Sequence, residues 1–237
     1  MIQFNSKKTL EYVSEFQNKA QSIKRYEGNP YVNGDNIAEH LCRLNRLLIT
    51  IAPHLKNEFP DRITLIEEVL VTLNIHDDDE IIDGFDIPTA IKVHNAKDGE
   101  EAEKFRLSIS QLGDHIVNYL LPLFTAFRQK DSLAAKIAKT LDNIAGNQLV
   151  IEQKIGLINP DQARFAIEYV EKVKGVSKTT DSLIQSQIDQ IIEYRKYAAS
   201  HFDELKSVPE NARKLLDIDV LNHPLNKTKI NVPLEQL

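Results

Sequence analysis

The spacing of apolar residues is the feature of this sequence that most limits its fold. Along nearly the whole chain, apolar residues recur every three or four positions, whereas sustained two-residue alternation of Val, Ile and aromatic side chains is hard to find. Leu10, Val13 and Phe16 show the pattern, since helical residues three or four positions apart lie on one face. The sequence therefore predicts an all-α protein.

Glycine, proline and capping residues divide this pattern into helices. Asp35 or Asn36 is a suitable N-cap for a helix that begins at residue 37, and Pro53 is expected to end that helix. Pro122 is expected to interrupt or kink a later helix, and one short helix with an irregular tail is expected after Pro209. The predicted helices cover residues 6–25, 37–52, about 62–80, 98–121, 131–154, 160–174 and 179–205.

Length and cysteine content favour a self-sufficient core in a reducing compartment. A chain of 237 residues buries roughly 70 to 75% of its unfolded surface on folding, so it needs no disulfide. Its single cysteine, Cys42, can form no internal bridge. The N-terminus lacks an apolar signal-peptide core, and no apolar run approaches the roughly 18 residues of a membrane helix. We therefore expect a cytoplasmic protein.

The charge balance disfavours a polymeric nucleic acid as a partner. The chain carries 29 basic and 35 acidic residues, for a net charge of -6, and has no compensating basic block. Binding to nucleic acid depends on Lys and Arg that neutralise phosphates. A small anionic ligand stays compatible with the sequence if a metal ion or a few convergent basic residues provide local positive charge.

Four polar residues stand where the helical pattern places core residues. His40 occupies the first inward position of the second predicted helix, and His76 and Asp77 end the inward face of the third. Asp142 interrupts an alanine-rich stripe of the helix over 131–154. The sequence thus predicts two imidazoles and two carboxylates on inward faces of three helices.

Each of these residues alone has an ordinary structural explanation. A single histidine on an apolar face is more often a hydrogen-bonded core residue than a ligand, and a buried aspartate usually forms a salt bridge or a cap. Together, however, the four groups have a large desolvation cost unless a shared partner compensates it. A divalent cation is such a partner, and this donor set suits Zn, Mn, Fe, Co or Ni better than Mg. Because periodicity does not show that the three helices converge, a metal-free polar network stays open as an alternative.

An ordered series of motifs surrounds these four residues. In chain order the series is Arg25-Tyr26, Ile37-Ala38-Glu39-His40-Leu41, His76-Asp77, Glu80, Gly84, Asp86-Ile87-Pro88-Thr89, Lys92, Asn95 and Lys139-Thr140-Leu141-Asp142-Asn143. It resembles the motifs of HD-domain metal-dependent phosphohydrolases, and within that family it resembles the YfbR-like branch of bacterial 5′-deoxynucleotidases. The resemblance spans roughly residues 20 to 155.

The resemblance implies a fold and a domain organisation. The expected fold is a single all-α HD-domain helical bundle over residues 1–155, with a C-terminal helical extension over 156–237 that packs on this core. Two departures from the branch concern the site. Phe85 is inserted between Gly84 and Asp86, and Tyr26 stands where the branch generally has Trp. These departures leave the shape of the loop and the nucleotide preference open.

The resemblance also implies a role for each site residue. One divalent metal ion, with open positions for water and a phosphate oxygen, would be held by His40, His76, Asp77 and Asp142. Glu80 would orient or deprotonate the attacking water, and a helix continuing from His76 would place it on the same side, one turn further along. The implied substrate-binding residues are Arg25 for phosphate, Asp86 for the sugar, and Tyr26, Thr89 and Lys92. Without such a site, the run from Asp77 to Glu80 would be a solvated acidic helix end.

We therefore expect a metal-dependent phosphohydrolase, and specifically a phosphomonoesterase that removes the 5′-phosphate of (deoxy)nucleoside monophosphates through a metal-activated water. A nucleotide pyrophosphohydrolase, a phosphodiesterase and a non-catalytic metal-bearing regulatory module are the alternatives. The expected cofactor is one divalent metal ion, which could be Mn, Co, Zn, Fe, Ni or Mg. The expected partner is a small phosphorylated substrate, with no polymeric nucleic acid and no membrane, and the resemblance is compatible with a homodimer.

Overall fold

The computed structural model describes residues 6–27, 29, 31–86 and 98–200, and its secondary structure is helical apart from one isolated bridge between Lys24 and Asn36. No strand occurs within these ranges, so the all-α prediction is confirmed. The helices are α1 (Ser6–Ser22), α2 (Ile37–Glu58), α3 (Leu65–Ile75), α4 (Asp78–Asp83), α6 (Asp98–Ser110), α7 (Asp114–Gln129), α8 (Leu133–Gln153), the 3₁₀ helix η1 (Gly156–Ile158), α9 (Pro160–Glu171) and α10 (Lys178–Ser200).

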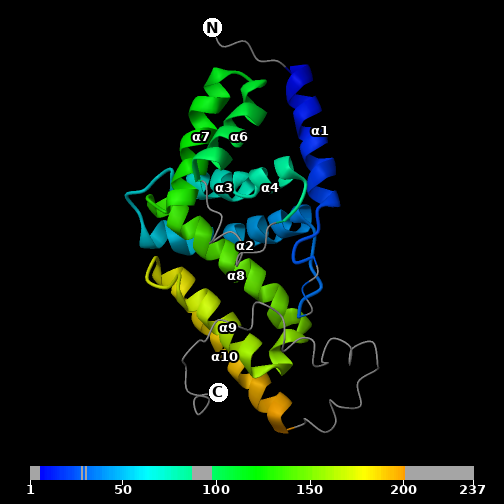
Figure 1. Cartoon of the computed structure of the whole chain (residues 1–237). Helices are drawn as coiled ribbons and strands as arrows, with labels where there is room; N and C mark the ends of the chain where they lie inside the picture. Colours follow the sequence, from blue (N-terminus) through cyan, green and yellow to red (C-terminus); the bar gives the residue numbers. More distant parts are fainter. Residues whose placement is uncertain (1–5, 28, 30, 87–97, 201–237) are drawn as a thin grey trace.

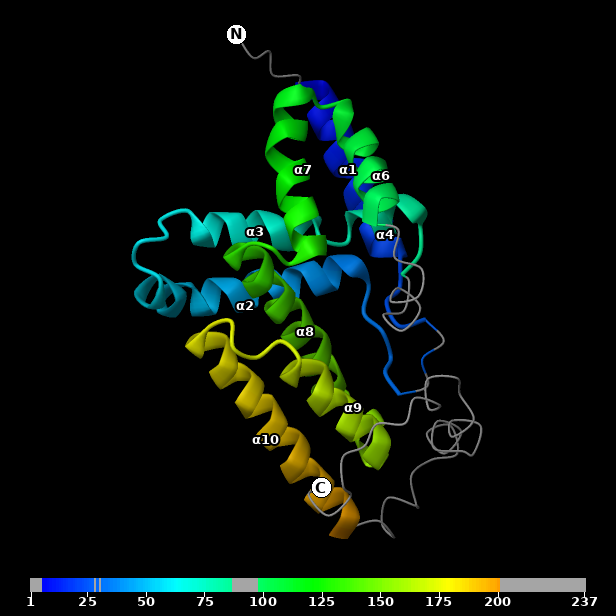
Figure 2. The same ribbon diagram turned by 60° about the vertical axis from the view of Figure 1, so that its left-hand side comes forward.

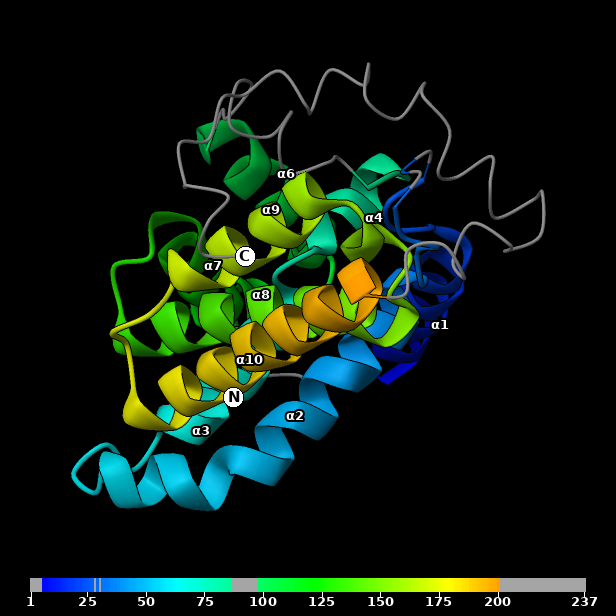
Figure 3. The ribbon, with the colours of Figure 1, turned by 90° about the horizontal axis from the view of Figure 1, so that it is seen from below.

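Helix α8 is the element around which the others are arranged. It crosses the side-by-side pair α2 and α3, and α9 and α10 lie along its other side (Figures 1 and 2). Viewed from below, α10 lies over α8 and next to α2 (Figure 3). Helices α6 and α7 pack together beyond α3 and α4. Because α2, α3 and α8 cross, the start of α2, the end of α3 and the middle of α8 lie close together although they are distant in sequence.

The main core lies between these crossing helices. Its buried residues come from α2, α3, α7, α8, α9 and α10, and they include Leu44, Leu48, Val69, Leu73, Ile137, Leu141, Val170 and Ile184. The amphipathic patterns of the sequence thus meet in one apolar cluster, whose burial stabilises the bundle by roughly 25 cal/mol per Å² of apolar surface. The division into a core over 1–155 and an extension over 156–237 stays a prediction, and the expected helix after Pro209 lies outside the described residues. No helix in the described part of the chain combines the length and the apolar character needed to cross a bilayer.

Pro53, which was expected to end a helix, and Pro122, which was expected to interrupt or kink one, both lie inside helices. Pro53 lies within α2, where it removes only the hydrogen bond to the carbonyl of Ile49, a residue that is 62% exposed. The buried side chains of Ile51 and Leu55 hold the remaining turns of α2 against the core. The break expected at Pro122 occurs earlier, between α6 and α7, where Gly113 adopts a φ of 107° that favours glycine.

The third predicted helix is also shorter than expected. Helix α3 ends at Ile75, Asp77 leaves the helical region with φ -107° and ψ 15°, and the short helix α4 follows. Helix α4 ends at Gly84, whose φ of 83° allows its N–H to reach the carbonyl of Glu80. Glu80 therefore belongs to α4, and the prediction that it continues the face of α3 was wrong. The break lies at the His-Asp doublet itself.

Candidate metal centre

His40 is fixed by the way α2 begins. The side chain of Asn36 accepts the N–H of Glu39 at 2.9 Å, and the side chain of Glu39 accepts the N–H of Asn36 at 3.0 Å, which forms a reciprocal capping box. This cap sets the first turn of α2 so that His40 points inward, where it is fully buried. The sequence signal for the helix start thus also positions a site residue.

His76 and Asp77 lie at the break between α3 and α4. The His76 Nδ1 lies 2.8 Å from the carbonyl oxygen of Leu73, so Nδ1–H donates to that oxygen and Nε2 points away from the backbone. The His76 Nε2 lies 3.2 Å from Asp77 Oδ2. A histidine oriented through its other nitrogen in this way is typical of metal ligands.

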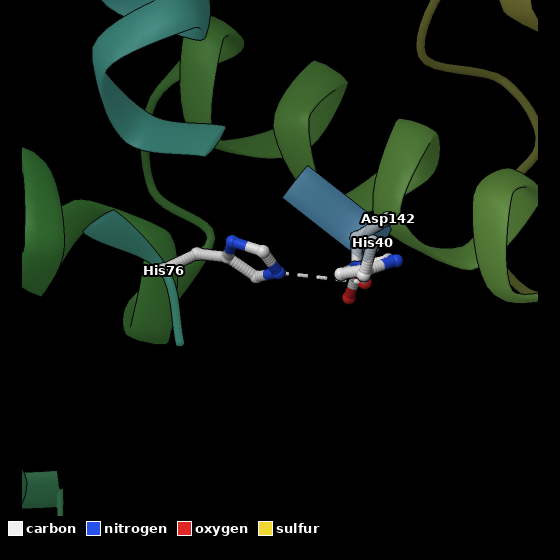
Figure 4. A group of neighbouring side chains, drawn as sticks. All are labelled: His40, His76 and Asp142. Carbon is white, nitrogen blue, oxygen red and sulfur yellow. Dashed lines mark hydrogen bonds and ion pairs between the residues drawn. The ribbon is translucent and has the colours of Figure 1, made fainter. Parts of the chain in front are cut away.

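Asp142 projects from the middle of α8 toward both histidines (Figure 4). Its Oδ1 lies 3.1 Å from His40 Nε2 and 3.5 Å from His76 Nε2. One ligand atom from each of the three residues lies within 4.8 Å of the others. The exposed fractions are 0% for His40, 1% for His76, 8% for Asp77 and 6% for Asp142. The structure thus brings all four predicted ligands together, from α2, the α3–α4 break and α8.

The electrostatics of this cluster favour a cation. Burial and the Arg25 guanidinium lower the pKa of His40, which keeps that imidazole neutral. Burial acts to lower the pKa of His76 too, but the carboxylates of Asp77 and Asp142 outweigh it and raise the pKa to about 10. Burial alone would raise the pKa of Asp142, yet Lys139 and the two histidines hold it well below its usual range. The field that favours a proton on His76 would equally favour a metal ion.

The donor set fits a divalent metal ion. Two imidazole nitrogens and carboxylate oxygens suit borderline and harder divalent cations. The Nε2 atom of His76 is buried and lies 3.2 Å from Asp77 Oδ2 and 3.5 Å from Asp142 Oδ1, but it makes no hydrogen bond of good geometry within the described part of the chain. A buried polar atom without a hydrogen bond has a large free-energy cost, which a bound cation would remove. His40, His76 and Asp142 could therefore hold a metal ion, with Asp77 beside them.

The cluster opens into a cavity of ≈ 200 Å³ that three cationic side chains line, namely Arg25, Arg128 and Lys139. Arg25 Nη2 lies 4.0 Å from Asp142 Oδ1, and its Nε and Nη1 are buried and make no hydrogen bond to the described residues. The Lys139 ammonium donates to Asp142 Oδ2 at 2.7 Å. Unsatisfied guanidinium donors beside a cavity are suited to bind an oxyanion.

Glu80 lines the same cavity as His76, Asp77 and Asp142, and it is 2% exposed. Its neighbours Asp78 and Asp79 are also buried, so the alternative of a solvated acidic helix end was wrong. Burial raises the pKa of Asp78, and Asp79 forms an ion pair with Arg128. Partners from distant helices, which no local pattern reveals, keep this run inside the protein.

Tyr26 and Asp86 form the next part of the cavity wall. The N–H of Tyr26 donates to Asp86 Oδ2 at 2.9 Å, across sixty positions of sequence. Tyr26 has a φ of 58°, and its hydroxyl lies so close to Gly146 that a Cβ there would approach it to 2.8 Å. Phe85 is 56% exposed, so the inserted residue points away from the core. Thr89 and Lys92, also predicted to bind substrate, lie outside the described residues.

Two of the cationic residues, Arg128 and Lys139, were not among the predicted site residues. Arg128 comes from α7 and pairs with Asp79 and with Glu101, whose Oε2 lies 3.3 Å from its Nε. No periodic pattern connects α7 to the motifs, so no sequence signal marks Arg128. Lys139 lies one turn before Asp142 on α8, and this i, i+3 spacing could have identified it.

The fold and the site together define an all-α bundle with a buried His, His-Asp and Asp cluster that could hold a metal ion. The sequence model of the HD-domain family matches residues 17–184, which is most of the chain, so the protein belongs to the HD-domain family. No curated protein matched the chain.

The chain is also similar to a crystal structure of a predicted metal-dependent phosphohydrolase from Magnetospirillum magnetotacticum MS-1, with a TM-score of 0.55 and 20% sequence identity. The similarity covers 80% of this chain and 93% of that one. At this identity it establishes a shared fold.

Proposed function

We propose that the protein is a metal-dependent phosphohydrolase, and specifically a phosphomonoesterase that removes the 5′-phosphate of (deoxy)nucleoside monophosphates. The observation that carries the proposal is that His76 and Asp142, two members of the buried His, His, Asp group, line one cavity together with three cationic side chains. In the proposed reaction the negatively charged phosphate of the substrate would bind there, between the cation-binding cluster and the cationic side chains. The description of the Magnetospirillum protein as a predicted metal-dependent phosphohydrolase agrees with it.

The proposed chemistry divides among the residues that line the cavity. A divalent metal ion, when bound by His40, His76, Asp77 and Asp142, supplies Lewis acidity that lowers the pKa of water and offsets charge on phosphoryl oxygens. Arg25 would bind the phosphate through Nε and Nη1, the two guanidinium nitrogens that make no hydrogen bond to the described residues. Lys139 would hold the carboxylate of Asp142 in place through its hydrogen bond.

Glu80 is the proposed general base. Its carboxylate lines the cavity beside the cluster, and it is buried, so it can accept a proton from a water that attacks the phosphorus. Once the bond to the ester oxygen breaks, the leaving alkoxide takes up a proton from solvent. The products are inorganic phosphate and an alcohol.

The length of the cavity favours a substrate larger than a phosphate group. Asp142 and Val150 both line it and lie two turns apart on α8. At 1.5 Å per residue, the cavity follows this helix for about 12 Å. Tyr26 and Asp86 line the cavity as well, and we propose that Asp86 contacts the sugar through the carboxylate oxygen that does not accept the Tyr26 N–H.

A phosphate-release assay tests the proposal. Purified protein loaded with Mn²⁺ or Co²⁺ should release inorganic phosphate from nucleoside 5′-monophosphates, and a chelator should stop the release. If metal-loaded protein releases phosphate from no phosphomonoester, the phosphomonoesterase proposal is wrong.

Product analysis in the same assay separates the related activities. Release of pyrophosphate from nucleoside triphosphates would identify a pyrophosphohydrolase. Cleavage of phosphodiesters without release of inorganic phosphate would identify a phosphodiesterase. Binding of metal and nucleotide without any turnover would identify a regulatory module.

A further inference from the structure

The far end of the cavity is walled by two helical stripes that the proposed phosphate chemistry does not use. On α8 the stripe consists of Gly146 and Val150, one and two turns beyond the metal-cluster residue Asp142, and on α9 it runs from Tyr169 through Phe165 to Gln162. Residues four or three positions apart lie on one helical face, so each stripe presents a continuous wall. Figures 1 and 2 show α8 and α9 lying side by side.

The register of the two helices fixes which end of α9 lies beside the metal cluster. The Asn143 side chain donates to the carbonyl oxygen of Tyr169 at 2.9 Å, so Tyr169 lies at the level of Asp142. Phe165 lies one turn away, about 6 Å further along α9. The phenyl ring of Phe165 stacks on Tyr169 with centroids 6.0 Å apart, and it is 50% exposed.

Charge separates this end from the metal end. Among the residues lining the cavity, the charged ones belong to the metal cluster, to the cationic side chains, or to Glu80 and Asp86. The wall formed by Val150, Phe165 and Ala166 is apolar, and the amide side chains among the lining residues are those of Asn29, Asn147 and Gln162. An uncharged, flat group fits such a wall, because every nucleobase has a face that can stack on an aromatic ring.

We infer that the α9 stripe around Phe165 binds the base of the substrate nucleotide. This inference rests on the proposed function, in which the phosphate lies at the metal end and the sugar beside Tyr26 and Asp86. The base then lies one to two helical turns from the metal end, against Phe165. Phe165 is a specificity residue that adds binding energy for nucleotides over simple sugar phosphates.

A comparison of two substrates tests the inference. In the metal-loaded full-length protein, Phe165→Ala should raise KM for adenosine 5′-monophosphate about tenfold with little change in kcat, because a lost stacking contact weakens binding without changing the reaction. KM for ribose 5-phosphate, which has no base, should stay within about twofold. Phe165→Tyr, which keeps the ring, should behave like the wild type on both.

Tyr119→Ala is the matched control, because Tyr119 is an aromatic residue of similar exposure, 48%, that does not line the cavity. It should change neither KM. Equal KM changes of Phe165→Ala on both substrates, or none on either, would overturn the base-binding assignment.

Calorimetric binding keeps the two proposals separable. If the wild type turns over neither compound, the phosphomonoesterase proposal fails, yet tighter binding of adenosine 5′-monophosphate than of ribose 5-phosphate that Phe165→Ala abolishes would still support the base site. Equal affinity of the wild-type protein for the two compounds would refute the base site, whatever the turnover.

Discussion

Asp142 and Glu80 both line the cavity, and their different surroundings predict different roles for the two carboxylates, a metal ligand and a general base. Asp142 Oδ1 lies between two imidazole nitrogens, at 3.1 Å and 3.5 Å, whereas Glu80 is outside that His, His, Asp group. Asp142→Asn removes the negative charge that a cation would share with His40 and His76, so the purified variant should contain little metal. Glu80→Gln should keep its metal while kcat falls by about 10² to 10⁴, the usual contribution of a general base.

Metal content by mass spectrometry and kcat for adenosine 5′-monophosphate measure the two effects. A Glu80→Gln protein that is as depleted of metal as Asp142→Asn would show that Glu80 is a ligand. A metal-loaded Glu80→Gln protein with unchanged kcat would remove Glu80 from the mechanism.

Arg25 provides a second test at the level of a single side chain. Arg25→Lys keeps the positive charge near Asp35 and Asp142 but loses the planar set of N–H donors that the cavity leaves unsatisfied. KM for a phosphomonoester and Ki for inorganic phosphate should both rise about tenfold. Arg43→Lys is the control, since Arg43 also approaches Asp35, at 3.7 Å, without lining the cavity. Equal effects of the two substitutions would mean that Arg25 acts on folding and does not bind phosphate.

At the level of elements, the end of α2 caps the start of α10. The carboxylate of Glu58 accepts the N–H of Lys178 at 2.6 Å and of Thr179 at 3.1 Å, together with the hydroxyls of Ser177 and Thr179. Although burial acts to raise the pKa of Glu58, these donors hold it below its usual value of 4.5. The carboxylate thus adds to the local N-cap, in which the Ser177 hydroxyl accepts the N–H of Thr180 at 3.2 Å, and it joins two helices that are distant in sequence.

Glu58→Gln should therefore lower the stability of the fold in a pH-dependent way. Since the folded state depresses the pKa, the contribution of Glu58 is fully present above pH 4.5 and is lost as the pH falls through the folded-state pKa. We expect Tm to drop by about 3 °C at pH 7, which corresponds to about 1 kcal/mol for a lost cap, and the drop to shrink below pH 4. Thermal unfolding followed by circular dichroism checks this, with the exposed Glu171→Gln as control. A drop in Tm that is the same at pH 7 and at low pH would contradict the assigned role of the charge.

At the scale of the whole molecule, a metal ion at the cluster would join α2, the α3–α4 break and α8, which cross at the centre of the bundle. A ligand that binds only the folded state stabilises it by RT ln(1 + [L]/Kd), or about 2.7 kcal/mol at one hundred times Kd. Mn²⁺ should then raise Tm by about 5 to 10 °C, and a chelator should reverse the rise. Asp142→Asn should show no rise, and an equal rise in that variant would locate the stabilising ion elsewhere.

The helical class and the inward position of His40, His76, Asp77 and Asp142 followed from the sequence, because both depend on periodicity that is local to each helix. The start of α2 was also readable, since the capping box at Asn36 lies within four residues. Predictions of helix boundaries from local sequence failed where packing against other helices decides whether a helix continues. Pro53 stays inside α2 because Ile51 and Leu55 are held by the core, and the helix breaks at His76-Asp77 although no glycine or proline stands there.

The sequence by itself determined that the chain is helical, where most helices begin, and which four polar side chains face inward. Only the tertiary structure decided that these side chains meet, that Arg128 from α7 compensates the buried Asp79, and that α9 walls the far end of the cavity. The physical reason is that helix formation and facing depend on residues three or four positions apart. Convergence and charge compensation depend instead on packing between segments that can lie more than a hundred residues apart, such as those of His40 and Asp142.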